Sequence, residues 1–497
     1  MTNTLTDALA AGQFCYVVEL VASALKREAQ VLEIAARLAM LRDIAAGSVT
    51  SYAGGKFGQD PVRVASAVRA RGLTPNIHLT CVYDDRKRIR KTLEALHALD
   101  LHNVFALTGD YPTHKEAPPK FDLDSVQLVG LIERMRQERG VPFNIAVAVS
   151  PFKYAREDCL YQYLKLEKKV AAGADVAITQ VGWDARKFTE LKRYVDERNI
   201  RVPLLGNVYV LSRKAAERMS GGSPPGCWAS PELVETVRRE SEIPDRPGDP
   251  KGAAALEARL ERAAQTVAVL KGLGYAGAYI GGTHDAAQVS HIIDRSRELE
   301  PRWQECAEAL HFGQQGGFYL YDSPKPIKRR LPVVSIILGT ASNLAPVTPD
   351  TPVRRGLAAV SGWIDRSPLL RKLTERLEYV VKRPVFGCEA CGNCVLSYME
   401  YVCPQTCPKQ MRNGPCGGTF QTRCEVIDQE CIWVSVYQRA EAAQRVPELK
   451  TFVPAPDRTL QGTSSWINYF LGRDCRPRDD VARSANQSVP VKGGSLP

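Results

Sequence analysis

The stretch Asn103-Val-Phe-Ala-Leu-Thr-Gly-Asp-Tyr-Pro112 decides the fold of this chain. Its apolar run ends in Thr108-Gly109-Asp110, and Pro112 stops any extension of the strand. Such a strand carries a flexible backbone and one carboxylate at its C-terminal edge, which is where ligands bind in a parallel α/β barrel. We therefore expect a ligand site next to Asp110, although a loop cap is an alternative role for this residue.

Strand-like apolar runs alternate with amphipathic helical stretches on both sides of this segment. The stretch quoted above supplies the fourth strand, and the other expected strands are 14–21, 48–52, 76–81, 143–149, 176–180, 203–209 and 277–281. The clearest expected helices are 25–45, 62–71, 85–99, 157–172 and 254–273. Eight strand–helix units within residues 1–300 predict a (β/α)₈ TIM barrel of the α/β class.

The rest of the chain predicts an extension and a second, smaller domain. The insert 221–252 is rich in Gly and Pro, which indicates a loop or lid over one face of the barrel. Residues 301–382 are expected to form a linker or extension, in which 332–338 could add a strand. The composition of residues 383–474 predicts a cysteine-rich C-terminal domain of metal-binding type, and the polar tail 475–497 is expected to be disordered.

The composition is ordinary for a soluble globular protein. Hydrophobic residues make up 44% of the 497 residues, charged residues 24%, and the net charge is +11. The basic run Lys325-Pro-Ile-Lys-Arg-Arg330 favours a solvated face over an anion or nucleic-acid site. We find no RNA-binding signature and no zinc-finger Cys/His spacing, so we expect no nucleic-acid partner.

The hydropathy pattern predicts a cytoplasmic protein without a membrane partner. The sequence Met1-Thr-Asn-Thr-Leu-Thr-Asp7 lacks a basic segment followed by an apolar one, and no run approaches the roughly 20 apolar residues of a membrane span. Fourteen cysteines in a reducing compartment then indicate metal or thiol chemistry rather than disulfides.

Four polar positions in the barrel region suggest chemistry, and each has a plainer alternative. Glu19 lies in an apolar strand, where burial would raise its pKa into the general-acid range, or it is an edge residue in a salt bridge. His78 is more often a satisfied core histidine than a ligand. Gln180 ends a strand, where its amide can donate and accept toward a heterocycle. Lys168 and Lys169 could reach a phosphate, although a solvated lysine pair is the commoner case.

The C-terminal cysteines give the strongest local signal. Their spacing begins as C-x₂-C-x₂-C and continues irregularly, and no histidine occurs among them, so any metal site would be all-thiolate. This spacing resembles that of [4Fe–4S] ligands, and zinc also accepts four thiolates. Eight cysteines can supply two such sites, or they can be buried thiols of a small domain. The predicted metal ligands are Cys388, Cys391, Cys394, Cys403, Cys407, Cys416, Cys424 and Cys431.

Taken together, these segments resemble the methylenetetrahydrofolate reductase family over roughly residues 10–300. The matching pieces are Glu19, His78-Leu-Thr-Cys81, Ala106-Leu-Thr-Gly-Asp110 and the segment from Leu166 to Gln180. The cysteine region, with Asn413-Gly-Pro-Cys-Gly-Gly418, is similar to a cysteine-rich module that accompanies some bacterial members. In some of those systems the module is a separate electron-transfer subunit, whereas here it is fused.

The resemblance implies a flavin-bearing barrel that reduces 5,10-methylenetetrahydrofolate to 5-methyltetrahydrofolate, or that runs in reverse in methyl-group catabolism. Glu19 matches the general acid, Asp110 a carboxylate near pterin and flavin, and Gln180 the residue that contacts the pterin and the nicotinamide donor in turn. The implied flavin-binding residues are Tyr52, His78, Thr108, Gly109, Asp110, Lys153, Lys168 and Lys169. We expect FAD, with FMN as the alternative, and NAD(P)H or a protein as the electron donor. We also expect a homo-oligomer.

The sequence departs from the family pattern in ways that bear on the cofactor and the folate tail. Thr108 stands where many members have arginine, Val149-Ser-Pro-Phe-Lys-Tyr154 replaces a Tyr/His-containing flavin segment, and Gln162 stands where aspartate is common. The stretch Gly281-Gly-Thr-His-Asp285 lacks the arginine that holds the folate tail. The choice between FAD and FMN and the residue that binds the glutamate tail therefore stay open.

Two other functions stay open on the sequence. A folate-binding barrel can act as a methyltransferase that needs no flavin, with the cysteine module passing the methyl group to a corrinoid or thiol. A non-enzymatic electron-transfer subunit would show cluster absorbance without folate turnover, but the presence of both Glu19 and Asp110 argues against it.

Overall fold

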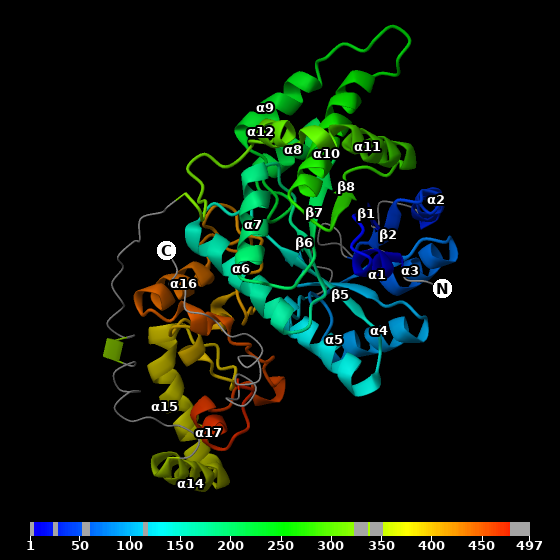
Figure 1. Cartoon of the computed structure of the whole chain (residues 1–497). Helices are drawn as coiled ribbons and strands as arrows, with labels where there is room; N and C mark the ends of the chain where they lie inside the picture. Colours follow the sequence, from blue (N-terminus) through cyan, green and yellow to red (C-terminus); the bar gives the residue numbers. More distant parts are fainter. Residues whose placement is uncertain are drawn as a thin grey trace. The chain divides into compact units, whose positions relative to one another are not determined.

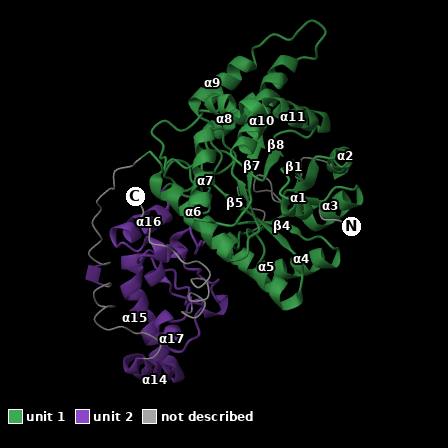
Figure 2. Cartoon of the chain, viewed as in Figure 1, with its two compact units in different colours: residues 1–324, 416–428 green, residues 325–415, 429–497 purple. Residues whose placement is uncertain are grey.

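The computed structural model describes residues 4–22, 28–51, 60–112, 118–322, 336–337 and 351–477 (Figure 1). The chain divides into two compact units, residues 1–324 with 416–428 and residues 325–415 with 429–497 (Figure 2). Tyr52, most of the expected strand 332–338 and residues 478–497 of the expected tail lie outside the described residues.

The first unit contains a closed barrel of eight parallel strands in sequence order, which confirms the predicted (β/α)₈ fold (Figure 1). The strands are β1 (Cys15–Leu20), β2 (Ile44–Val49), β3 (Pro75–Thr80), β4 (Asn103–Leu107), β5 (Asn144–Val149), β6 (Val176–Thr179), β7 (Leu204–Tyr209) and β8 (Gly277–Gly281). β1 closes the barrel by pairing with β8, with Cys15 opposite Gly277. Because the strands are parallel, all eight C-terminal ends share one rim.

Helices follow the strands as the (β/α)₈ pattern requires, and short polar side chains begin them. They are α1 (Thr4–Ala10), α2 (Glu28–Leu38), α3 (Pro61–Ala70), α4 (Arg86–Ala98), α5 (Ser125–Arg139), α6 (Arg156–Ala171), α7 (Ala185–Glu197), α8 (Arg213–Ser220), α9 (Pro231–Glu240), α10 (Ala253–Gly272), α11 (Ala286–Leu299) and α12 (Trp303–Ala309). Asp124 caps α5 through the backbone amides of Val126 and Gln127, and the Gln127 side chain completes a capping box.

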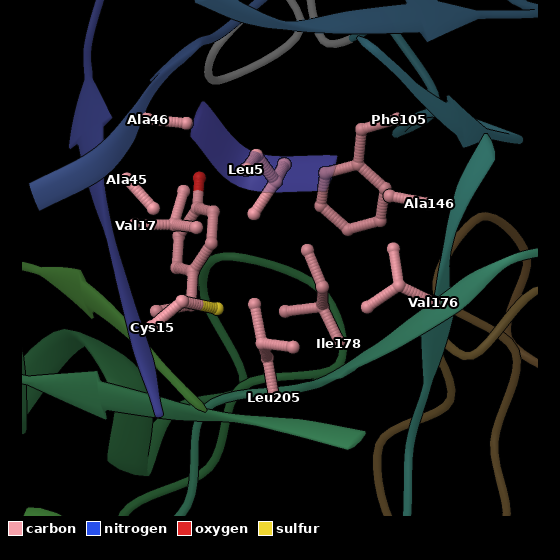
Figure 3. Packing of buried hydrophobic residues seen from close by; sticks show 11 residues of the cluster. Leu5, Cys15, Val17, Ala45, Ala46, Phe105, Ala146, Val176, Ile178 and Leu205 are labelled. Carbon is pink, nitrogen blue, oxygen red and sulfur yellow. The ribbon is translucent and has the colours of Figure 1, made fainter. Parts of the chain in front are cut away.

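Small and branched side chains, together with the rings of Phe105 and Tyr279, fill the barrel interior (Figure 3). Leu5 from α1 lies in this cluster, so α1 closes the barrel interior at the end where the strands begin. The Thr4 hydroxyl donates to the backbone oxygen of Ala45 at 2.5 Å and holds α1 in place. A filled interior confines ligands to the rim above it.

The expected helix 25–45 and the expected strand 48–52 are wrong in their bounds. α2 ends at Leu38, and β2 already begins at Ile44 and ends at Val49. All six residues of β2 are buried, so Ile44-Ala-Ala-Gly-Ser-Val49 has no polar face that would reveal its period. Alanine favours helices in isolation, but burial inside the barrel overrides that preference here.

The insert 221–252 is partly helical rather than only a loop. α9 lies within it, and Ser230 caps the helix by accepting from the Leu233 amide at 3.1 Å. Leu233 and Cys227 pack in one buried cluster with Val181 and Trp183, which directly follow β6. The insert is therefore anchored to the C-terminal rim of the barrel.

The second unit is mainly helical. Its elements are α14 (Pro352–Arg366), α15 (Pro368–Phe386), α16 (Ile432–Ala442), α17 (Ser465–Phe470) and short 3₁₀ turns. α14 and most of α15 fall within the expected linker 301–382. Their exposed apolar side chains include Leu369, Leu373 and Leu377, and a stripe of this kind marks a surface that another protein or segment covers. The predicted homo-oligomer stays a prediction.

No helix in the described part of either unit is long and apolar enough to cross a membrane.

Candidate functional site

The three predicted catalytic residues stand on the C-terminal rim of the barrel. Glu19 is the last residue but one of β1, Asp110 follows β4 by three residues, and Gln180 directly follows β6. The topology therefore brings together residues that are about 70 to 160 positions apart in the sequence.

Glu19 is half-buried, and its carboxylate lies between the ends of β7 and β8. A Cβ built on Gly281 would stand 3.1 Å from Glu19 Oε2 and 3.2 Å from the Tyr209 ring. Burial, and next the charge of Glu19, raise the pKa of Tyr209. Glycine at position 281 thus leaves the space that this carboxylate occupies.

Cys227 shows that the acidic residues face a common space. Its thiol is buried, and burial followed by the charge of Asp110 raises its pKa to about 12. Lys153 and Glu19 also act on this thiol, Lys153 lowering its pKa and Glu19 raising it. Asp110, Glu19 and Lys153 therefore all lie close enough to Cys227 for their charges to act on its thiol, and no sequence motif singles out this cysteine.

Gly109 and Thr108 shape the loop that presents Asp110. Gly109 has φ +87°, and a Cβ there would overlap the side chain of Val82 and stand 3.1 Å from Thr80 Cβ. The Thr108 hydroxyl is buried and has no hydrogen-bond partner among the described residues. Glycine at position 109 is thus a steric requirement of this turn.

Replacing Gly109 with alanine should destabilise the barrel by about 2–4 kcal/mol, because it adds a left-handed conformation and an overlap with Val82. Gly12→Ala is the matched control, since Gly12 has φ +65° but nothing within 4 Å of an added Cβ. Gly12→Ala should lower the free energy of unfolding by only about 1 kcal/mol. Urea unfolding of both variants checks the difference, and equal costs would contradict the steric account.

The Gln180 amide is oriented by its own backbone. The Gln180 backbone N–H donates to Val149 at 2.8 Å, and its side-chain oxygen accepts from the Val181 amide at 2.9 Å. Its Nε2 lies 3.3 Å from the point where a Cβ on Gly226 would stand. The amide nitrogen therefore faces the insert at the rim.

His78 is a satisfied histidine of the barrel interior. Its Nε2 lies 3.0 Å from Ser48 Oγ and 3.3 Å from the Tyr279 hydroxyl, and its ring meets Phe105 edge-on. Burial lowers its pKa to about 3, so the ring is neutral at physiological pH.

Lys168 and Lys169 are not the solvated pair of the plainer interpretation, because both are buried on α6. Burial lowers the pKa of Lys168 to about 7 and lowers that of Lys169 well below its usual value. The Lys169 ammonium donates to the backbone oxygen of Ala148 at 2.6 Å. Burial makes the charged form of each lysine costly, and an anionic ligand such as a phosphate would offset that cost.

Lys153 is also buried, and its ammonium contacts residues 416–428 of the same unit. It donates to Thr419 Oγ1 at 2.9 Å, to the Thr419 backbone oxygen at 3.2 Å and to the backbone oxygen of Gly417. An aromatic hollow opens beside it, with walls that include Phe152, Trp228 and Phe318. Such a hollow can stack a flat ring.

The eight predicted metal ligands do not form one group. Cys388, Cys391, Cys394 and Cys403 line one cavity of the second unit. Cys407 and Cys431 belong to the same unit outside that lining, whereas Cys416 and Cys424 belong to the barrel unit. Among the described residues, no group of three or more Cys, His, Asp or Glu stands in metal-holding geometry.

Two buried cations flank this four-cysteine cavity. Lys382 Nζ lies 3.6 Å from Cys394 Sγ, and Arg412 Nη2 lies 3.8 Å from Cys391 Sγ. Burial and the other three thiols raise the pKa of Cys403 to about 11. The four thiols thus share one cavity with two neighbouring cations, although among the described residues they do not stand in metal-holding geometry.

Comparisons with known proteins show what the two parts of the chain are similar to. Residues 4–223 match the family described as methylenetetrahydrofolate reductase, and residues 368–459 match that described as methylene-tetrahydrofolate reductase C terminal. A probable methylenetetrahydrofolate reductase (NADPH) of Caenorhabditis elegans is 28% identical over 167 residues, which are 31% of this chain and 24% of that protein. The 5,10-methylenetetrahydrofolate reductase of Salmonella typhimurium is 28% identical over 142 residues, 28% of this chain and 45% of the relative.

The matches therefore span less than half the length of these curated relatives. A solved structure of an uncharacterized Clostridium thermocellum protein, described as binding two copies of 5-methyl-5,6,7,8-tetrahydrofolic acid, has a TM-score of 0.40 at 11% identity. It covers 60% of this chain and 99% of that chain, and a score this low supports no argument about ligands.

Proposed function

We propose that the barrel of this chain, in which residues 4–223 match the methylenetetrahydrofolate reductase family, interconverts 5,10-methylenetetrahydrofolate and 5-methyltetrahydrofolate with a bound flavin. The observation that carries the proposal is the gathering of Glu19 and Asp110 around Cys227, on the rim that also carries Gln180. This set offers a carboxyl acid, a second carboxylate and an oriented amide, which suit a pterin and its one-carbon bridge.

Glu19 is the proposed general acid. Its carboxyl is half-buried beside the end of β8, where it can face a ligand on the rim. Protonation of a folate nitrogen opens the ring that holds the one-carbon unit and leaves a reactive iminium carbon. Asp110 and Gln180 are proposed to hold the pterin so that this carbon faces the hydride donor.

The flavin supplies the hydride when it is bound, and the chain supplies orientation and protons. Lys168 and Lys169 are the residues proposed to hold its phosphate, since an anion would offset their desolvation. The buried hydroxyl of Thr108, which has no hydrogen-bond partner among the described residues, offers a further contact. FAD is proposed with FMN as the alternative, and the donor is NAD(P)H or a protein.

The affinity for flavin should fall as the pH rises above about 7. The pKa of Lys168 is lowered to about 7 without an anion, and a neighbouring phosphate would raise it again, so binding takes up a proton. Between the pKa of Lys168 in the free protein and its pKa in the flavin complex, the dissociation constant for the flavin should rise about tenfold per pH unit. Fluorescence titration of the apoprotein with FAD and FMN from about pH 6 to about pH 9 measures this slope.

Lys168→Arg should remove the slope, because arginine stays protonated. Lys192→Met is the matched control, since Lys192 pairs with Asp196 at 2.6 Å on the exposed side of α7 and should leave the slope unchanged. A wild-type affinity that is flat across this range would contradict the role of Lys168.

For the second unit we propose a metal centre on Cys388, Cys391, Cys394 and Cys403, either [4Fe–4S] or zinc. Cys407, Cys416, Cys424 and Cys431 were also predicted as ligands, and a second site on them stays a prediction.

Anaerobic turnover of the full chain tests the function. The protein is given 5,10-methylenetetrahydrofolate, flavin and a chemical reductant, and 5-methyltetrahydrofolate is quantified by chromatography. We expect product in excess of enzyme. A protein that binds folate without flavin and instead passes a methyl group to a corrinoid or thiol would favour the methyltransferase function.

A further inference from the structure

Residues 416–428, which we call the strap, belong to the barrel unit although the sequence around them belongs to the second unit (Figure 2). The strap reads Cys416-Gly-Gly-Thr-Phe-Gln-Thr-Arg-Cys-Glu-Val-Ile-Asp428. The chain thus leaves the second unit after Pro415, contributes a segment to the barrel and returns at Gln429.

Lys153 and Asp158 anchor the strap from the barrel side. The Lys153 ammonium donates to Gly417 and Thr419, as described above, and Thr419 Oγ1 donates to a carboxylate oxygen of Asp158. Lys153 and Asp158 are 4.0 Å apart, and only 4% and 2% of their surfaces are exposed. A buried ammonium and a buried carboxylate are costly unless they are bonded, so their shared contact with Thr419 fixes the strap firmly.

Two glycines of the insert allow the strap to approach closely. A Cβ on Gly222 would stand 2.6 Å from the Phe420 ring, and a Cβ on Gly226 would stand 2.5 Å from the Gly417 backbone oxygen. The same point at Gly226 is 3.3 Å from Gln180 Nε2. The main chain of the strap and the amide proposed to face the pterin therefore border the same small space.

Buried polar groups beneath the strap keep unused hydrogen-bonding capacity. Ser150 Oγ, Gln162 Nε2 and Asp158 Oδ1 are buried and have no hydrogen-bond partner among the described residues. A Cβ on Gly417 would stand 3.8 Å from Gln162 Nε2 and 3.9 Å from Ser150 Cβ. Unpartnered polar groups are costly in an interior, so this region is built to receive a polar ligand.

We infer that the strap forms one wall of the folate site and that Lys153 is the positioning residue that holds this wall. The inference rests on the proposed function, because it names which part of the chain completes that site. Gly417 lets the main chain approach the ligand, and the closed wall excludes water from the reacting carbon. The barrel sequence alone therefore makes an incomplete site.

Hydrogen exchange by mass spectrometry and binding of 5-methyltetrahydrofolate by equilibrium dialysis test the inference on the full chain. In Lys153→Met, exchange of strap amides should rise about tenfold or more, and the dissociation constant for 5-methyltetrahydrofolate should rise by a similar factor. Thr419→Val keeps the shape of the side chain but removes the hydroxyl contacts with Lys153 and Asp158. It should also raise both the strap exchange and the dissociation constant. Lys192→Met is again the control and should move neither.

Each outcome decides a separate point. Unchanged strap exchange in Lys153→Met and in Thr419→Val would overturn the anchoring role. Raised exchange of the strap amides with unchanged affinity for 5-methyltetrahydrofolate would contradict the claim that the strap forms a wall of the folate site. A wild-type protein that fails to bind 5-methyltetrahydrofolate would overturn the proposed function and the wall with it, while exchange would still report the anchor. If Lys153→Met does not fold, Thr419→Val carries the test.

Discussion

Glu19→Gln is expected to lower turnover of 5,10-methylenetetrahydrofolate by about 10²- to 10⁴-fold, the usual contribution of a general acid. The amide has nearly the same size and fits the same space beside Gly281, but it cannot release a proton to the folate nitrogen. Flavin binding and chemical reduction of the flavin should be unchanged, because the anion-binding lysines lie on α6.

Stopped-flow measurement of the two half-reactions separates these effects. In Glu19→Gln, the rate of flavin reduction should be unchanged, whereas the rate of flavin reoxidation by the folate should fall. Glu33→Gln is the matched control, since Glu33 is an exposed residue of α2 paired with Arg37 at 2.6 Å. Full folate turnover by Glu19→Gln would remove Glu19 from the mechanism.

Cys391→Ser is expected to abolish metal binding by the second unit while the barrel still binds flavin. Cys391 lines the four-cysteine cavity next to Arg412, and a tetrathiolate centre loses most of its affinity with one ligand. Metal analysis of anaerobically purified protein should show iron with sulfide, or zinc, in the wild type and almost none in the variant.

Two further cysteine variants sharpen this test. Cys475→Ser is the control from the same unit, because Cys475 is half-buried but does not line the cavity. Cys424→Ser should also keep this metal, because Cys424 belongs to the barrel unit. Unchanged metal content in Cys391→Ser would mean that these thiols are only buried packing residues and do not bind the metal.

The barrel could be predicted from sequence because its signal is local. Each strand is an apolar run of a few residues that ends in a turn, as in Ala106-Leu-Thr-Gly-Asp110, and burial of both faces preserves that pattern. β2 was placed too late because Ile44-Ala-Ala-Gly-Ser-Val49 has neither a polar face nor a strong strand former at its centre. The predicted acids could be found in the same way, since Glu19 interrupts an apolar strand and Asp110 follows a required glycine.

The rest of the site depends on contacts that no local pattern contains. Lys153 and Gly417 are 264 positions apart, and the strap resembles an ordinary part of a cysteine-rich domain until its contacts are known. Cys227 carries no motif and gains its place from the packing of the insert. Spacing alone also could not divide the eight cysteines between the two units, because that division follows from where the strap packs.

The central claim is that this barrel exchanges hydride between a flavin and a folate. Its most direct test is the visible spectrum of the anaerobically purified full chain, with flavin, iron and zinc quantified, before and after addition of 5-methyltetrahydrofolate. We predict a bound flavin whose absorbance is bleached as the folate is oxidised to 5,10-methylenetetrahydrofolate. A protein that takes up neither FAD nor FMN, or whose flavin does not respond to either folate, would contradict the claim.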